Sequence, residues 1–197
     1  GADDNASAVA GLLELARLLK KKPLKHTIEL AAYCTEEPPY FATEDMGSMR
    51  HALALREKGV DVIAMISLEM IGYFSDEPNS QGYPLSALEY IYPTTGNFIG
   101  VLGILQDWRC IGKMAWAMGR TTDLPVYFAP IPALIPGTLL SDHRCFIEQG
   151  FPAMMVSDLA FYRNKAYHEP EDTADRLDYK RMAKVVVGVY KAIQILD

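Results

Sequence analysis

The sequence has no apolar stretch near the roughly 20 residues that a membrane-spanning helix needs, so no membrane span is predicted. Basic residues are also in the minority. The 19 Lys and Arg stand against 25 Asp and Glu, which gives a formal net charge of -6. A nucleic-acid-binding protein would show a basic patch or stripe, and none is visible, so no nucleic-acid partner is expected.

Cysteine is scarce as well. Cys34, Cys110 and Cys145 lie far apart, and no metal-type Cys pair occurs. Cys34 lies in an apolar run, which predicts a buried, inert thiol. Half of the 197 residues are hydrophobic and 22% are charged, so the chain can form a substantial core and is not a disordered segment. We expect one domain over residues 1–197.

Helical periodicity alternates along the chain with short apolar runs. Either Asn5 or Ser7 is expected to cap the first helix. The predicted helices cover about Ala6 to Lys22, Met46 to Lys58, Gln106 to Gly119 and Tyr179 to Leu196; the predicted strands are His26–Cys34, Val60–Leu68, Asn97–Leu105, Pro125–Phe128 and Pro152–Ser157. This alternation predicts an α/β fold whose sheet is covered by helices on both faces.

Acidic and imidazole side chains stand at the ends of these elements. In such sheets, ligands gather at the carboxyl ends of strands, so these side chains are expected to converge on one edge. Carboxylate and imidazole groups are common zinc ligands. The residues are Asp4 before the first helix, Glu36 and Glu37 after the first strand, Glu69 at the end of the second strand, and His168 in a late irregular loop.

Each of these residues also has an ordinary interpretation. An Asp before a helix is usually a cap, and a Glu pair in a loop is usually solvated. Glu69 interrupts an apolar segment, where a carboxylate is costly unless it is paired or bound to a metal. The adjacent Glu36 and Glu37 suit a hydrolytic zinc site, because one can bind the metal while its neighbour takes a proton from the metal-bound water.

Several motifs, in this order, resemble those of the M28 zinc peptidases, which are aminopeptidases and relatives with a co-catalytic zinc pair. That family implies a mixed, largely parallel central sheet flanked by helices on both faces. The matching segments are Gly1-Ala2-Asp3-Asp4-Asn5-Ala6-Ser7, Thr35-Glu36-Glu37, Met46-Gly47-Ser48, Ser141-Asp142-His143 and the stretch from Tyr167-His168 to Asp172-Thr173.

The resemblance implies metal ligands at four positions. Asp4 would bridge two metals, and Glu37 and His168 would complete one zinc site. Glu69 stands where many members have Asp as a ligand of the other metal.

The resemblance also implies roles around the metals. Glu36 would be the general base, and Tyr167 would donate to the scissile carbonyl oxygen. Asp142 and His143 are candidates for supporting a ligand or the bound water. The alternative for this segment is a helix N-cap formed by Ser141 or Asp142.

The family's remaining ligand is a His in an H-x-D motif shortly before the first matching segment, and this sequence starts after it. We therefore expect one complete zinc site, an incomplete second site and missing first strands. A preceding segment or another chain would complete the sheet. The resemblance alone suggests a secreted or periplasmic location.

The leading functional hypothesis is hydrolysis of the peptide bond after a free N-terminal residue. A glutaminyl cyclase that uses one zinc ion is an alternative, because Asp4, Glu37 and His168 match its Asp, Glu and His set. A non-catalytic homologue that binds a partner is the third. The loops 75–96 and 129–140 are expected to line an apolar substrate pocket.

Overall fold

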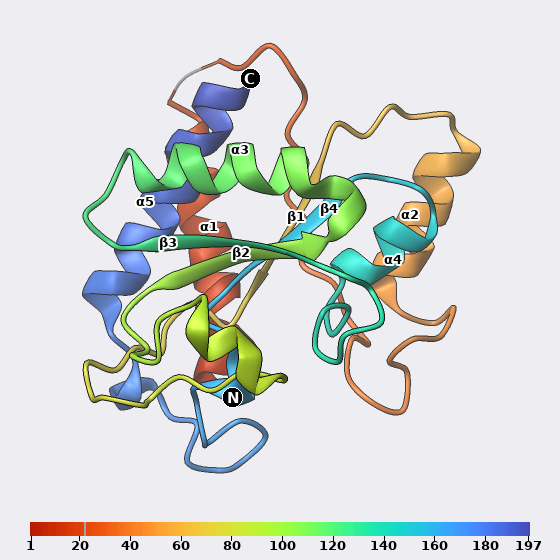
Figure 1. Ribbon diagram of the computed structural model, residues 1–197. Helices are drawn as coiled ribbons and strands as arrows, with labels where there is room; N and C mark the ends of the chain where they lie inside the picture. Colours follow the sequence, from red (N-terminus) through yellow and green to blue (C-terminus); the bar gives the residue numbers. More distant parts are fainter. Residues whose placement is uncertain (22) are drawn as a thin grey trace.

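A computed structural model of the chain describes residues 1–21 and 23–197. Within this part of the chain, four strands form one sheet in the order β1-β4-β2-β3 (Figure 1). The β1–β4 and β2–β3 pairs are parallel and the β2–β4 pair is antiparallel, so the expected mixed, largely parallel sheet is confirmed. The strands are β1 (Met65–Glu69), β2 (Ile99–Ile104), β3 (Val126–Ile131) and β4 (Ala153–Ser157).

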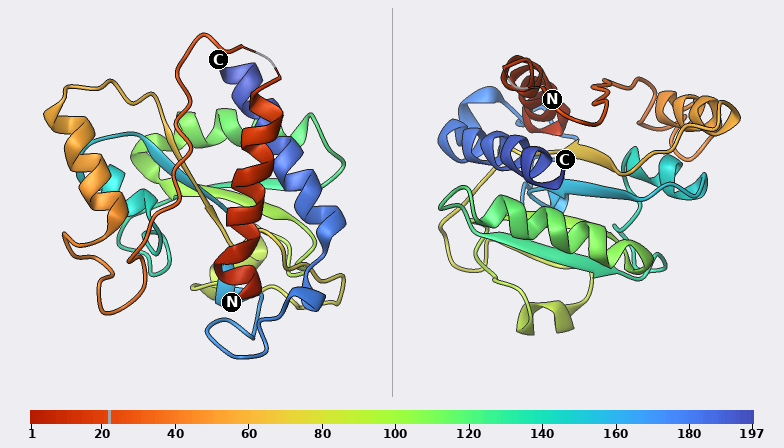
Figure 2. Two further views of the ribbon diagram at one scale, coloured as in Figure 1. Left: turned by 180° about the vertical axis from the view of Figure 1, so that it is seen from behind. Right: turned by 90° about the horizontal axis from the view of Figure 1, so that it is seen from above.

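Helices cover both faces of this sheet (Figure 2). Three long helices, α1 (Ala8–Leu19), α3 (Trp108–Gly119) and α5 (Tyr179–Leu196), pack on one face. The other two, α2 (Gly47–Glu57) and α4 (His143–Glu148), pack on the opposite face beside β1 and β4. Short helical turns complete the described elements at Ala2–Ser7, Ser86–Tyr90, Leu105–Asp107, Ala160–Tyr162 and Ala174–Arg176.

Alternation along the strands divides the core from the site. In β4, Met154 and Val156 belong to the core under the long helices, whereas Met155 and Ser157 line a pocket on the opposite face. The same alternation places Val101 of β2 in that core and Leu102 in the pocket. Successive side chains of a strand point to opposite faces of the sheet. One face of the sheet therefore packs against the long helices, and the other forms the base of the pocket.

One predicted strand is wrong. Residues 26–34 are not in a strand, and β1, the expected next strand, pairs only with β4 among the described residues. In the part of the chain that the structure describes, no neighbouring strand offers backbone hydrogen bonds to this apolar run. Its side chains are also partly open to solvent, with Ile28 38% and Leu30 37% exposed. Cys34 is exposed, so the prediction of a buried thiol is also wrong.

The first helix begins differently from its prediction. Neither Asn5 nor Ser7 makes a side-chain cap hydrogen bond. Asn5 instead donates to the carbonyl of Leu68 and accepts from the N–H of Met70, while Ser7 accepts from the N–H of Ile71. These bonds fix the start of the chain to the end of β1. The helix α1 ends at Leu19, and the predicted end at Lys22 lies outside the described residues.

The remaining predicted elements agree with the structure to within a few residues at their ends, and α5 has the predicted bounds. The predicted strand Val60–Leu68 is shorter, since only Met65–Glu69 form β1. In the described part of the chain, no helix combines the length and the apolar character that crossing a membrane would require.

Candidate metal centre

Three of the predicted metal ligands meet at one point. The Nε2 atom of His168 lies 3.1 Å from Oδ2 of Asp4 and 3.1 Å from Oε1 of Glu37. One ligand atom from each residue lies within 4.8 Å of the other two. Asp4 comes from the turn before α1, Glu37 from the loop before α2, and His168 from the loop after β4, so the fold assembles the cluster from distant parts of the chain.

This arrangement fits a zinc ion. Tetrahedral zinc with bonds of about 2.0–2.2 Å separates neighbouring ligand atoms by roughly 3.4 Å, close to the two distances at His168. Carboxylate and imidazole groups both bind zinc, and catalytic zinc sites use three protein ligands and leave a fourth position open. Glu37 and His168 are exposed, so this position can be reached from solvent.

Several carboxyl groups in and around this cluster have raised pKa values. Burial, followed by repulsion from Asp142, Glu37 and Asp4, raises the pKa of Glu36 to about 8. Burial and the neighbouring Glu37 raise the pKa of Asp4 as well. Carboxyl groups gathered in this way hold protons or a cation, because their mutual repulsion disfavours the fully ionised state. The cluster therefore has the electrostatic character of a cation site.

Glu69 lies in the same pocket but outside the cluster of three. Its Oε2 accepts a hydrogen bond of 2.7 Å from the hydroxyl of Ser141, whose Oγ lies 3.0 Å from that of Ser67. Burial is the main cause that raises its pKa well above the usual value, and Glu36 and Asp4 add to it. Glu69 is thus held at the carboxyl end of β1, beside the cation site, by a serine pair.

Ser141, Asp142 and His143 each have different surroundings. Neither Ser141 nor Asp142 caps α4 with its side chain, so the alternative of a side-chain cap is wrong. Asp142 instead adds negative charge beside Glu36, and burial raises its own pKa. His143 is buried, and its Nε2 lies 2.7 Å from the carbonyl of Thr138. His143 therefore contacts the pocket loop, and within the described part of the chain its side chain forms no hydrogen bond with a predicted ligand.

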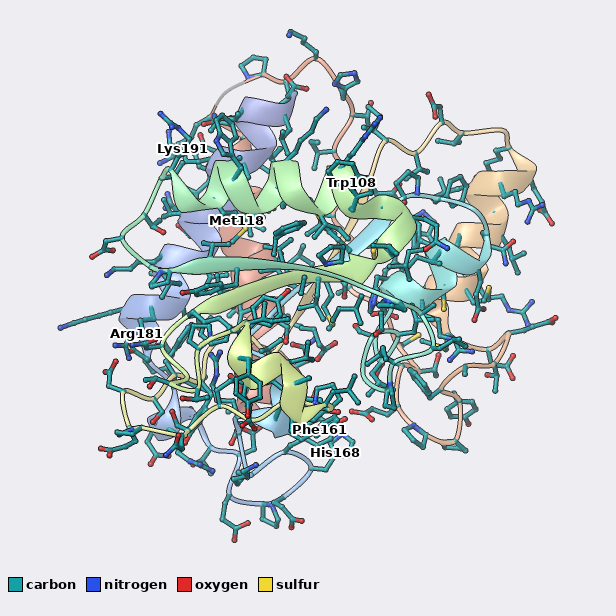
Figure 3. All side chains as sticks on the ribbon, in the orientation of Figure 1. Trp108, Met118, Phe161, His168, Arg181 and Lys191 are labelled. Atoms are coloured by element: carbon teal, nitrogen blue, oxygen red, sulfur yellow. The ribbon has the colours of Figure 1, made fainter. Side chains whose placement is uncertain are left out.

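Tyr167 stacks on the ring of His168, with the ring centroids 3.8 Å apart and an angle of 18° between the planes. It lines the pocket, and burial raises the pKa of its hydroxyl. The ring of Phe161 also packs near Tyr167, at a centroid distance of 5.4 Å, and Figure 3 shows Phe161 and His168 close together. The Tyr167 hydroxyl is thus a neutral hydrogen-bond donor beside the cluster of Asp4, Glu37 and His168.

A pocket opens beside the cluster of Asp4, Glu37 and His168. It extends over the sheet face opposite the three long helices. The loops 75–96 and 129–140 both contribute to it, as the sequence predicts. Among the described residues that line it, the charged ones are Asp4, Glu36, Glu37 and Glu69. Away from these carboxylates its walls are apolar and aromatic, and they include Tyr83, Leu88, Tyr92, Phe98, Tyr127 and Tyr162.

The sequence interpretation missed a buried polar network behind the ligands. Asp3 accepts from the N–H of Gly72 and from the amide of Asn164. Burial, reinforced by Asp3, raises the pKa of the neighbouring Asp158 well above its usual value, and the guanidinium of Arg163 opposes this shift. Only the position of Asp3 next to Asp4 could have indicated this network, because its other members come from the loops after β1 and β4.

Comparison with known proteins identifies the family of this chain. The profile of Peptidase family M28 matches residues 1–193. The chain belongs to peptidase family M28. Among relatives of this M28 chain, the Escherichia coli (strain K12) protein YfbL is 50% identical over 189 residues, which cover 96% of the chain and 58% of YfbL. A probable aminopeptidase of Saccharomyces cerevisiae (strain ATCC 204508 / S288c), YDR415C, is 30% identical, with 96% and 46% covered.

Solved structures share the M28 fold. A zinc aminopeptidase from Bacillus subtilis, BSAP, matches with a TM-score of 0.71 and 20% identity, covering 100% of this chain and 42% of its own. A glutaminyl cyclase from Porphyromonas gingivalis matches with a TM-score of 0.63 and 19% identity, covering 100% and 64%. At these identities the likeness concerns the fold alone. The M28 chain spans about half the length of the curated relatives it matches.

Proposed function

We propose that this chain carries the metal centre of a zinc-dependent exopeptidase that hydrolyses the peptide bond after a free N-terminal residue. The observation that carries the proposal is the cluster of Asp4, Glu37 and His168, with Glu36 beside it, at the mouth of an apolar pocket. Membership of family M28 and relatives named aminopeptidases support the same reaction class.

The chain's own residues would divide the chemistry. A zinc ion held by Asp4, Glu37 and His168 would supply Lewis acidity and lower the pKa of a bound water. Glu36 would accept a proton from the attacking water and return it to the leaving amine. Its pKa of about 8 applies without a cation, and a neighbouring positive charge would lower it towards the range of a working base. The Tyr167 hydroxyl would donate to the carbonyl oxygen as negative charge develops there.

The metal content is part of the proposal. The chain offers three ligands to one ion, whereas a second ion would have Asp4 and Glu69. We therefore propose that residues 1–197 hold one zinc ion firmly and a second one weakly. Metal analysis after dialysis would show close to one zinc per chain, and two firmly held ions would contradict this.

The pocket suggests the class of substrate. The aromatic walls around Tyr92, Phe98 and Tyr127 offer apolar contact and no compensating charge to a basic or acidic side chain. Burying a charged side chain there would carry a desolvation cost. We propose that the preferred peptides begin with a large apolar or aromatic residue.

A matched pair of variants tests the reaction. Glu36→Gln removes the proposed base, and Glu44→Gln makes the same chemical change at an exposed residue of the same loop. With the p-nitroanilides of leucine and phenylalanine, we expect turnover to fall by about 10²–10⁴-fold in the first variant and to stay unchanged in the second. N-acetylation of the substrate should abolish turnover.

Undiminished turnover in Glu36→Gln would refute the assigned base. Zinc content without hydrolysis of any peptide in a broad panel would favour a non-catalytic homologue instead.

One observation favours a second candidate. The complete ligand set serves a single zinc ion, as a glutaminyl cyclase requires, and one such enzyme shares the fold. A cyclase would release ammonia from peptides that begin with Gln and would release no amino acid. An exopeptidase would release the N-terminal amino acid, so analysis of the products separates the two.

A further inference from the structure

A single carboxylate connects the start of the chain to the loop that carries His168. Both carboxylate oxygens of Asp172 accept from the N–H of Asp3 at 3.1 Å, and its Oδ2 also accepts from the N–H of Asp4 at 3.1 Å. Its backbone carbonyl accepts from the N–H of Ala2 at 3.0 Å. The turn that carries Asp4 is therefore anchored to the loop that carries His168.

The loop side of this connection is also fixed. The N–H of Asp172 donates to the carbonyl of Glu169 at 3.1 Å, which closes a turn directly after His168. The amide of Asn164 donates to Asp3 Oδ2 at 3.1 Å and approaches Asp172 Oδ1 at 3.4 Å. The Asn164 side chain is itself oriented by the bond that its Oδ1 accepts from a neighbouring backbone N–H.

Burial makes these contacts effective. Asp172 is 6% exposed and Asn164 is 1% exposed, so water competes little for their hydrogen bonds. Bonds to an ionised carboxylate are also stronger than neutral ones. By contrast, His168 itself is exposed, and its loop departs from regular structure. Asp172, four residues after that ligand, is a buried and hydrogen-bonded anchor for the loop.

We infer that Asp172 is a positioning residue, which holds Asp4 against His168 and thereby sets the affinity and geometry of the metal site. This rests on the proposed zinc centre. Asp172 touches neither ligand side chain in the described structure; it acts through the backbone of Asp4 and through its own loop. Groups that orient metal ligands typically contribute about 10–100-fold to metal affinity.

The test uses Asp172→Asn with Asp175→Asn as its control. Asparagine keeps the shape but turns one acceptor oxygen into a donor, which in either orientation faces the N–H of Asp3. Asp175 is exposed and lies in the same loop, so its variant makes the same change of charge without the contacts. Zinc affinity is measured by competition with a chromogenic chelator, and the ligand geometry by the visible spectrum of the protein loaded with Co²⁺.

We expect Asp172→Asn to weaken zinc binding about 10–100-fold and to change the Co²⁺ spectrum, while Asp175→Asn resembles the wild type. An unchanged affinity and spectrum in a folded Asp172→Asn protein would overturn the inference.

If that variant fails to fold, Asp172→Glu keeps the charge but moves the carboxylate by one methylene. A several-fold loss of zinc affinity in Asp172→Glu supports the inference, and an unchanged affinity overturns it. Wild-type protein that binds no zinc would instead refute the proposed metal centre.

Discussion

Glu36 and Glu37 are adjacent in sequence and meet different surroundings. Glu37 is exposed and faces His168, whereas Glu36 is partly buried among other carboxyl groups. The same side chain is thus placed once where it can bind a cation and once where it holds a proton near neutral pH. A buried carboxyl group with a raised pKa beside an exposed carboxylate suits a site that divides proton transfer from cation binding.

These different surroundings predict that substitutions of Glu36 and Glu37 affect zinc affinity and turnover differently. Glu37→Gln removes a charged ligand, so zinc affinity should fall about 100-fold or more, because the loss of a ligand exceeds that of an orienting group. Glu36→Gln should leave zinc affinity within about a few-fold of the wild type while turnover falls. Competition titration of both variants measures this. A larger loss of affinity in Glu36→Gln than in Glu37→Gln would reverse the two assignments.

His143 predicts a dependence of stability on pH. Burial lowers its pKa from 6.5 to about 4, although its hydrogen bond with Thr138 opposes the shift. The folded state therefore keeps the ring neutral where the unfolded state takes up a proton. This contribution is fully present above pH 6.5 and is lost as the pH falls towards 4. At about 1.4 kcal/mol per pKa unit, it reaches the order of 3 kcal/mol.

The measurement compares the wild type with His143→Gln, whose amide can still donate to Thr138. Between about pH 7 and pH 4, the wild type should lose on the order of 3 kcal/mol more free energy of unfolding than the variant. Denaturant titrations across this range give the difference, in which the opposite contributions of the buried carboxyl groups cancel. A difference that does not change with pH would show that His143 is not held neutral.

The sequence indicated the three clustered residues better than the residues that support them. Asp4, Glu37 and His168 could be found because each is a metal-binding type of residue at the end of an element. Ser141 and Asp172 act through hydrogen bonds to residues about 70 and 170 positions away, and no local pattern encodes such a contact. Their positions within the matching motifs were the only signal available.

Among the elements, the contact between β2 and α3 depends on a missing side chain. A Cβ atom added at Gly103 would lie 3.0 Å from the carbonyl oxygen of Ala153 and 3.0 Å from Ile111. One of these neighbours is backbone, which cannot move aside without disturbing the β4 strand. Gly112, on α3, would place a Cβ no closer than 3.7 Å to Phe128. The two glycines therefore differ in what they tolerate.

Gly103→Ala should destabilise the protein by about 1–3 kcal/mol through overpacking. Gly112→Ala should be neutral or stabilise it by up to about 1 kcal/mol, because alanine favours the helix over glycine. Urea unfolding of both variants measures the contrast. Equal stability of the two variants would show that the sheet and α3 are not packed as closely as described.

Helices and strands were predicted well where their sequence signal is local, and poorly where they depend on contacts with distant parts of the chain. The helix α5 was predicted with its observed bounds because its apolar periodicity is a local feature. The failure at residues 26–34 has a different cause, since an apolar run becomes a strand only beside a partner strand. Helix α4 was not predicted, because its six residues are too few to show periodicity.

For the molecule as a whole, the proposed metal would connect parts that are far apart in the chain. Asp4 lies before α1, Glu37 before α2, and His168 after the last strand, so a bound ion would tie together the chain's start and its late loop. This geometry exists only in the folded protein. A ligand that binds the folded state alone stabilises it by an amount that grows with its concentration.

Zinc should therefore raise the melting temperature of the wild type. At 100 times its dissociation constant, the stabilisation is about 2.7 kcal/mol. For a protein of this size, that corresponds to roughly 5–10 °C. Calorimetry with added zinc, and again after chelation, measures the shift, which should be reversible and should grow with zinc concentration. Glu37→Gln should show a much smaller shift at the same zinc concentration, because it lacks a ligand but keeps the fold. An equal shift in both proteins would place the stabilising zinc elsewhere on the molecule and would separate the three-residue cluster from metal binding.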